Sequence, residues 1–315
     1  MTEKELYKIL CKQELSIPIY SRDWWLDCVC GESGWDVLLY LKNGKIEASM
    51  PYHTPCKGII FMPPYTQTMG VWFNPDFENC RYSHNLFRKQ AICEDFIKRF
   101  PKYHYFLQTF HCSFTDWLPF YWNGFRQTTC YTYILPDISN TDELWNGLCE
   151  NISRNIQKAK NKFQLTVKRD VPTDLFLEIN AQTYRRQGMK PYSHEILRKL
   201  IECSRRRNQG DIWGAYDTEN RLHAVAFVVW QENCAYLMAC GFSETFRKSG
   251  GQFLALWTAI NDLSGQVSSF DFYGSMLRGV EHTYREFGAT QVPFLKIEKG
   301  KMDLLKRIRM KFFKL

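Results

Sequence analysis

The sequence predicts a mixed α/β (α+β) protein with two tandem domains, each a mixed, largely antiparallel twisted sheet flanked by helices. Three observations carry this prediction. The 315 residues are enough for two domains of ordinary size, and apolar residues make up 45% of them. Segments with strand and helix periodicity alternate along the chain in two rounds. In the second round, three strand-like segments follow one another with connections short enough for hairpins.

The first round occupies residues 1–138. A short helix is expected at Trp24–Cys28. Residues 35–41 and 45–52 then have the pattern of two strands, joined by Asn43-Gly44, the strongest short signal for a hairpin. A Pro-Pro pair interrupts regular structure soon afterwards. The other elements expected in this round are a helix at 82–100, a strand at 103–110, a helix or turn at 115–125 and a strand at 128–135.

The second round occupies residues 139–315. The boundary is placed at 137–141, where turn-forming residues follow a strand and Thr141 begins a helix with acidic residues in its first turn. Amphipathic spacing predicts one helix over 141–162. The further elements expected are a strand at 164–170, helices at 173–183 and 194–207, strands at 211–217, 222–231 and 234–243, a helix at 253–264, a strand at 267–276, a helix at 280–288 and a strand at 291–299.

Charge and cysteine content narrow the class of protein. The net charge is +8, but the last fifteen residues carry six Lys/Arg against one Asp. This basic C-terminal helix is either solvated, docked on the domain or laid on an anionic membrane surface. The twelve cysteines include no CxxC pair, so we expect neither disulfides nor a metal site. With no signal peptide and no apolar run of membrane-spanning length, a cytoplasmic location is expected.

A loop between a predicted strand and a predicted helix is the first candidate site. Backbone N–H groups at a helix N-terminus lack partners and attract anions. Two glycines let the backbone approach phosphate oxygens closely, and two basic side chains add charge. The loop suits a diphosphate such as that of coenzyme A; the alternative is a purely structural turn. Its residues are Arg247, Lys248, Ser249, Gly250, Gly251 and Gln252.

The order of these segments resembles the GCN5-related N-acetyltransferase (GNAT) superfamily. Its members have an Arg/Gln-x-x-Gly-x-Gly/Ala loop after the central strand. Residues 247–252 match the first four positions of that pattern, with Gln252 in place of the last. A Tyr followed four residues on by Gly, here Tyr284 and Gly288, marks the family's later helix. The resemblance implies acetyl-CoA or another acyl-CoA as co-substrate without a metal. It implies Tyr284 as the acid that protonates the leaving thiolate, or else as a packing residue.

A closer similarity is to the FemAB-like branch, in which two such folds lie in tandem. Residues 270–276, followed by 284–288, are similar to the strand-to-helix signature of that branch, with Tyr273 where an acidic residue is usual. Residues 155–159 resemble its helix with a Lys-Ala pair. The sequence lacks the long heptad stretch of the coiled-coil arm that some members use for transfer RNA.

Candidates for binding the acceptor lie on both sides of the predicted boundary. Asp271, at the end of a strand, would deprotonate or hold an amine, or else bond to the turn that follows. A pair of arginines between two helices would clamp a carboxylate or phosphate, unless it forms a solvated turn. A segment after the Pro-Pro pair lines an interdomain cleft or packs as a rigid loop. The substrate-binding candidates are Tyr65, Thr66, Gln67, Tyr184, Arg185, Arg186 and Ser275.

Taken with the resemblance, the sequence predicts an N-acyltransferase. The acyl group would pass by direct attack from an acyl-CoA to an amine on a small molecule or a cell-envelope precursor. Two alternatives stay open. One is a FemAB-type peptidyltransferase that uses aminoacyl-tRNA. The other is a GNAT-like protein that binds a ligand without catalysis. The histidines do not cluster with Ser or Cys in a hydrolase signature, and the sequence contains no nucleic-acid-binding motif.

Overall fold

The computed structural model describes residues 1–78, 81–186, 193–274, 276 and 278–302. The chain divides into two compact units, the first with Met1–Cys130 and Pro293–Leu315 and the second with Tyr131–Val292. This division differs from the expected boundary near residue 138, because two strands, β6 (Arg126–Leu135) and β12 (Thr290–Gly300), each cross from one unit to the other. The basic C-terminal helix predicted from the sequence lies outside the described residues.

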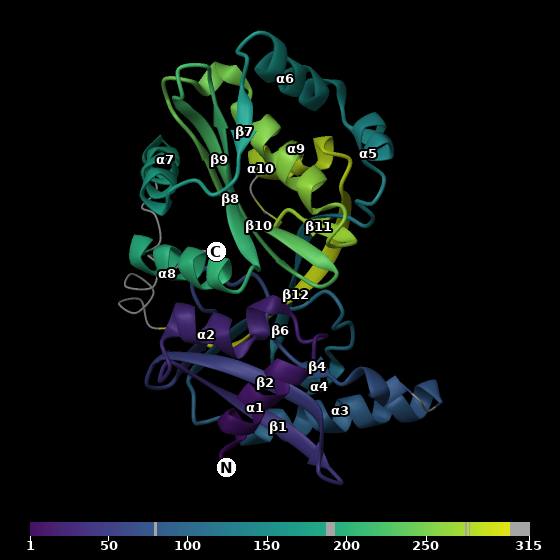
Figure 1. The fold of residues 1–315 in the computed structure, drawn as a ribbon. Coiled ribbons are helices and arrows are strands. Elements are labelled where there is room, and N and C mark those ends of the chain that lie inside the picture. Colours follow the sequence, from purple (N-terminus) through teal and green to yellow (C-terminus); the bar gives the residue numbers. More distant parts are fainter. Residues whose placement is uncertain (79–80, 187–192, 275, 277, 303–315) are drawn as a thin grey trace. The chain divides into compact units, whose positions relative to one another are not determined.

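The first unit contains a mixed sheet with the strand order β1-β2-β3-β5-β12 (Figure 1). Among the described strands of this unit, β3 and β5 pair in parallel and β4 pairs with β2; an isolated bridge between Met69 and Phe110 of β5 is also parallel. The predicted hairpin is confirmed: Asn43 and Gly44 join β1 to β2, and both have positive φ, as a two-residue hairpin turn requires. The remaining elements are α1 (Glu3–Gln13), α2 (Asp23–Cys30), β1 (Trp35–Lys42), β2 (Lys45–Cys56), β3 (Ile59–Phe61), β4 (Trp72–Phe73), α3 (Tyr82–Arg99), β5 (Tyr105–Phe110) and α4 (Leu118–Trp122).

The second unit contains a sheet with the strand order β7-β8-β9-β10-β11-β6. Again one pair is parallel, β10 with β11, and the others are antiparallel. The three consecutive strands predicted from short connections are confirmed as β8, β9 and β10. The elements are α5 (Thr141–Gly147), α6 (Glu150–Asn161), β7 (Thr166–Lys168), α7 (Thr173–Arg186), α8 (His194–Arg206), β8 (Gly210–Tyr216), β9 (Leu222–Gln231), β10 (Cys234–Phe242), α9 (Gly251–Leu263), β11 (Ser269–Asp271) and α10 (Arg278–Glu286).

The prediction of one continuous helix over 141–162 is wrong. Helix α5 ends at Gly147, a poor helix former, and Leu148 and Cys149 are extended before α6 begins. The break lets Leu148 pack against the core and lets the N–H of Cys149 donate to the carbonyl of Glu286 at 2.9 Å. Strand β11 is likewise much shorter than the expected 267–276, and it ends at Asp271.

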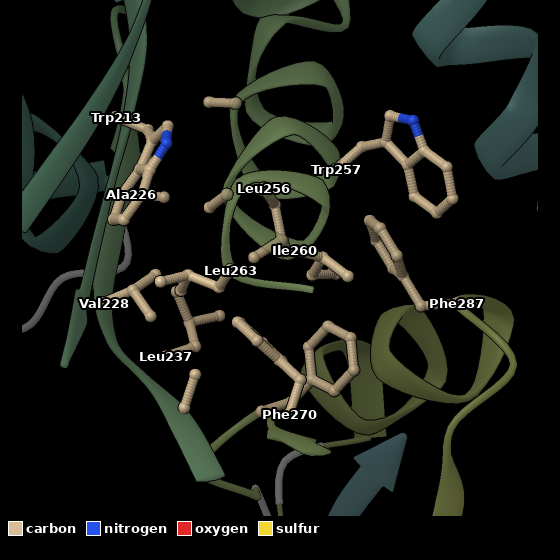
Figure 2. Packing of buried hydrophobic residues seen from close by; sticks show 14 of the residues in the cluster. Trp213, Ala226, Val228, Leu237, Leu256, Trp257, Ile260, Leu263, Phe270 and Phe287 are labelled. Carbon is tan, nitrogen blue, oxygen red and sulfur yellow. The ribbon is translucent and has the colours of Figure 1, made fainter. Parts of the chain in front are cut away.

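Helices cover both faces of the β8–β10 meander. Figure 2 shows Trp213, Val228 and Leu237 of the sheet meeting Leu256 and Ile260 of α9. On the other face α7 and α8 pack, as Phe176 of α7 does against Phe227. All residues of β9 after its first are therefore buried, as expected for a strand covered on both faces. This rigid meander positions the end of β10.

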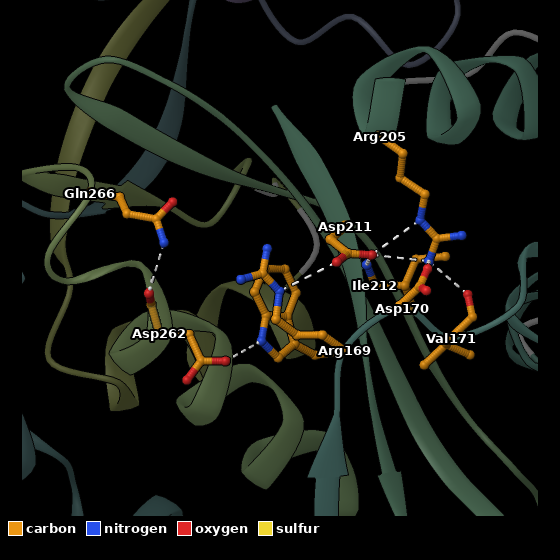
Figure 3. A network of polar contacts seen from close by, with 9 residues as sticks. Arg169, Asp170, Val171, Arg205, Asp211, Ile212, Asp262 and Gln266 are labelled. Atoms are coloured by element: carbon orange, nitrogen blue, oxygen red, sulfur yellow. Dashed lines mark hydrogen bonds and ion pairs between the residues drawn. The ribbon is translucent and has the colours of Figure 1, made fainter. Parts of the chain in front are cut away.

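A polar network ties the sheet edge to α8 (Figure 3). Asp211 accepts hydrogen bonds from Nε of Arg169 at 3.3 Å and from Nε of Arg205 at 3.1 Å. We expect Asp211→Ala to lower the free energy of unfolding by about 1–3 kcal/mol, because it leaves the partly buried guanidinium of Arg205 without this partner. Urea denaturation measures the change. Asp174→Ala is the control: it breaks an exposed ion pair and should cost less than about 1 kcal/mol.

Candidate active site

Strands β10 and β11 separate after a short stretch of pairing. Their parallel register covers only residues 234–236 and 269–271. Beyond Tyr236, β10 continues to Phe242 along β9, with a register shift between Leu237 and Ala239. No described strand pairs with its other edge there. Side chains of α7 occupy part of this edge: Nδ2 of Asn180 donates to the carbonyl of Cys240 at 3.3 Å, and the N–H of Phe242 donates to Oγ1 of Thr183 at 3.4 Å.

The candidate anion loop follows directly after β10. A single 3₁₀ turn, Arg247–Ser249, leads to Gly250, which is left-handed (φ 80°) and caps the N-terminus of α9. The N–H of Gly251 donates to Oγ of Ser249 at 3.2 Å. Among the described residues, no acceptor meets the backbone N–H groups of Gly250 and Gln252. With Arg247 and Lys248 exposed beside them, these two N–H groups at a helix N-terminus are of the kind that attracts anions, and the loop stays a candidate site.

Gly250 is required by packing as well as by conformation. A Cβ atom there would lie 2.4 Å from the backbone carbonyl oxygen of Asn155 on α6. We therefore expect Gly250→Ala to lower the free energy of unfolding by about 2 kcal/mol or more, and to weaken anion binding at the loop. Thermal and urea denaturation test this. Gly265→Ala is the matched control: its Cβ would meet nothing within 4 Å, and its stability should stay within about 0.5 kcal/mol of the original.

His223, which belongs to no sequence motif, packs against the segment that leads into this loop. The ring of His223 stacks on Phe246 with centroids 3.8 Å apart, and its Nε2 lies 3.1 Å from Oδ2 of Asp217. Burial alone would raise the pKa of Asp217, but hydrogen bonds from Arg221 and His223 hold it well below its usual value. Since an ionised carboxylate only accepts, Nε2 of His223 carries the proton. The cluster anchors residue 246, just before the anion loop.

Asp271 ends β11 and is 5% exposed. Its Oδ1 accepts a very short hydrogen bond from Oγ1 of Thr132 and a second from the N–H of Tyr273 at 2.8 Å. Burial raises the pKa of Asp271 to about 6, although both hydrogen bonds oppose the rise. Asp271 is therefore ionised at neutral pH yet close to accepting a proton. The bond from Tyr273 also fulfils the turn-stabilising role that the sequence left open.

Tyr284 lies close to Asp271 and to a thiol. Its half-buried ring packs against Phe272 with centroids 5.1 Å apart. Burial raises the pKa of the Tyr284 hydroxyl well above its usual value, and the negative charges of Cys240 and Asp271 raise it further. Cys240, near the end of the open edge of β10, is exposed to solvent, yet the protein around it raises the pKa of its thiol. A polar cluster of Cys240, Asp271 and Tyr284 thus lies where β10 and β11 separate.

The end of α7 contributes to the same region. The guanidinium of Arg186 lies 3.9 Å from the ring centroid of Phe242, and its charge acts on Cys240. Burial raises the pKa of Tyr184, and the charge of a Cys240 thiolate raises it further. Tyr184 is therefore also near Cys240. Arg185, in contrast, is exposed. Of the predicted arginine pair, only Arg186 is shown to act on this cluster.

Residues 148–285 match the family model described as Acetyltransferase (GNAT) domain. This range includes the open edge of β10, the anion loop, Asp271 and Tyr284. The protein has a GNAT/FemAB-like fold. No protein with a curated description matches the sequence.

Solved structures extend the GNAT-type likeness over nearly the whole chain. FemX has a TM-score of 0.69 at 12% identity, covering 94% of this chain and 96% of its own. L-PGS from Bacillus licheniformis has a TM-score of 0.55 at 12% identity, covering 99% and 96%. A tandem GNAT protein from the clavulanic acid biosynthesis pathway has a TM-score of 0.50 at 12% identity, covering 89% and 95%. These likenesses show the fold, and the predicted tandem GNAT-like fold class is confirmed.

The other candidates belong to the first unit or lie outside the described residues. Tyr65, Thr66 and Gln67 belong to the first unit, where all three are buried. Oγ1 of Thr66 accepts from the indole of Trp25 at 3.0 Å, a packing role. Ser275 lies outside the described residues. In the described part of the chain, no three His, Cys, Asp or Glu side chains are placed to hold a metal, and no helix is long and apolar enough to span a membrane.

Proposed function

We propose that the second unit transfers an acyl group from an acyl-CoA, such as acetyl-CoA, to an amine. The observation that carries this proposal is the order of two features along one strand. The open edge of β10 comes first, and the anion loop with the free N–H groups of Gly250 and Gln252 follows it. A long ligand with a diphosphate at one end and a thioester further along fits that order. The match of residues 148–285 to the GNAT domain supports it.

The polar cluster supplies the groups for direct attack. Ionised Asp271 accepts a proton from, or holds, the incoming ammonium group. The amine nitrogen then attacks the thioester carbonyl carbon, and a backbone N–H group on the unpaired edge of β10 stabilises the oxyanion. As the tetrahedral intermediate collapses, the carbon–sulfur bond breaks and the departing thiolate takes the proton of Tyr284. The extra proton on the attacking nitrogen passes to the Tyr284 oxygen, which leaves a neutral amide and restores the phenol. No covalent enzyme intermediate is required.

The proposed acceptor is an amine on a small molecule or a cell-envelope precursor. Tyr184 and Arg186 support an acceptor side at the end of α7, and Ser275 and Tyr65–Gln67 remain further candidates. In this proposal the protein is cytoplasmic and the N-terminal domain is a degenerate GNAT-like copy. The basic C-terminal helix offers a peripheral membrane contact.

Calorimetric titration with acetyl-CoA tests the donor directly. We expect a dissociation constant of about 1–100 μM, within the range usual for metabolic substrates. Arg247→Ala combined with Lys248→Ala should weaken binding several-fold, and more at low salt than at high salt. Absence of measurable coenzyme A binding would refute the proposal.

Aminoacyl-tRNA is the second candidate donor, and the likeness to FemX favours it. A titration with charged tRNA separates the two candidates. If tRNA is the donor, the logarithm of the binding constant should fall steeply and linearly with the logarithm of the salt concentration. Binding of tRNA without binding of acetyl-CoA would replace the acyl-CoA proposal with this one. A ligand-binding protein without catalysis would bind either donor and turn over neither.

A further inference from the structure

One guanidinium nitrogen of the acceptor side is buried without a partner. Nη1 of Arg186 is inaccessible to solvent and has no hydrogen-bond partner among the described residues. A charged donor in this state carries a desolvation cost that an anionic acceptor would offset. Stacking on Phe242 holds the guanidinium plane in place before any ligand arrives, which reduces the entropy lost on binding.

Asp271 provides the opposite charge in the same cluster. The described structure contains no ion pair between Asp271 and Arg186; Asp271 instead accepts from Thr132 and Tyr273. Strand β10 connects the two charges, since Asp271 is the register partner of Tyr236 on β10 and Arg186 stacks on Phe242 at the end of the same strand. A cation and an anion that do not pair with each other suit a ligand bearing one group of each sign.

We propose that the acceptor amine also carries an oxyanion, either a carboxylate or a phosphate ester, and that Arg186 binds this oxyanion while Asp271 receives the ammonium group. The inference rests on the proposed acyl transfer and narrows its acceptor to zwitterionic amines. The diphosphate of the donor is not the expected partner of Arg186, because the free N–H groups at Gly250 and Gln252 and the exposed Arg247 and Lys248 already form an anion site.

A series of ω-amino acids of increasing chain length, each paired with its methyl ester, tests the proposal. Binding to the protein saturated with coenzyme A is measured by calorimetry. At the best chain length we expect the acid to bind about tenfold or more tightly than its ester, as for a hydrogen bond to a charged group. The chain length at that optimum reports the separation of the two charged sites. Matched ω-aminoalkyl phosphates show which oxyanion is preferred.

Variants of the arginine pair identify the residue responsible. Arg186→Gln should reduce the preference for the acid over the ester to less than about twofold, and Arg186→Lys should retain part of it. Arg185→Gln, at the exposed neighbour, should leave the preference unchanged. Far-ultraviolet circular dichroism of each variant verifies folding.

The outcomes that overturn the inference are distinct from failure of the proposed function. Equal binding of acids and esters, or no binding of either class, refutes a zwitterionic acceptor. An equal effect of Arg185→Gln removes the specific role of Arg186. Loss of coenzyme A affinity in Arg186→Gln would assign this arginine to the donor instead. In all of these cases normal coenzyme A binding by the original protein would leave the acyl-CoA proposal standing.

Discussion

Replacing Tyr284 with Phe is expected to lower kcat by about 10²- to 10⁴-fold and to leave the affinity for acetyl-CoA almost unchanged. The substitution removes only the hydroxyl that protonates the leaving thiolate. The ring contact with Phe272 remains, so the fold should be preserved. Product formation under saturating donor and acceptor gives kcat, and calorimetry gives the donor affinity.

Undiminished turnover of Tyr284→Phe would assign this residue to packing, the alternative that the sequence left open. Tyr216→Phe, at the C-terminal end of β8, serves as a control and should keep full activity. The pKa of Tyr284 lies well above the usual value, because burial and two neighbouring acids disfavour the phenolate. Ionisation of Tyr284 should therefore not limit activity below about pH 10.

The local signals in the sequence are the ones that the structure bears out. Asn43-Gly44 forms the expected hairpin, since a two-residue turn needs positive φ at both positions and these residue types tolerate it. Gly250 is also identifiable from its motif. A second requirement for glycine at position 250 is its close packing against the carbonyl of Asn155 on α6. This is a tertiary contact, so the local sequence does not predict it.

Contacts between distant segments account for what sequence reasoning missed. Thr132 and Asp271 are separated by 139 positions, and only the pairing of β6 with β11 brings them together. The same pairing explains the difference in the domain boundary. Strand β6 ends the first round of the sequence but completes the sheet of the second unit, and β12 pairs with β5 in the first. No periodicity within a single segment encodes such an exchange.

The roles of Cys240 and Arg186 could not be predicted from the sequence either, because they depend on contacts with other elements. The sequence presents Arg185 and Arg186 as equivalent members of a pair. Their difference arises because only Arg186 stacks on Phe242, a residue of another element. Cys240 carries no motif at all, and its place in the cluster follows from the end of β10 remaining unpaired on one side.

Replacing Asp271 with Asn is expected to change activity and stability in opposite directions. Activity should fall by about 10²- to 10³-fold at pH 7, because the amide can neither take a proton nor hold an ammonium group by charge. The original enzyme should lose kcat/KM as pH falls through about 6, the pKa of Asp271, and the variant should lack this step. Thr132→Val removes a hydrogen bond that lowers this pKa, so its midpoint should move above pH 6. An unmoved midpoint in Thr132→Val would mean that another group controls the profile.

Stability should respond with the reverse sign. The folded pKa of Asp271, about 6, lies above its ordinary value of 3.8, so the folded state binds the extra proton between these values. The stability linked to this group is fully present below pH 3.8 and is lost as pH rises through 6. At pH 7 the buried charge therefore costs up to about 3 kcal/mol. An asparagine oxygen still accepts from Thr132 and Tyr273, so the variant should be about 1–3 kcal/mol more stable at pH 7. The gain should vanish at pH 4, and urea denaturation at the two pH values measures it. A variant less stable at both would show that the carboxylate is held for the fold, whereas a gain confined to pH 7 is the mark of a charge kept for chemistry.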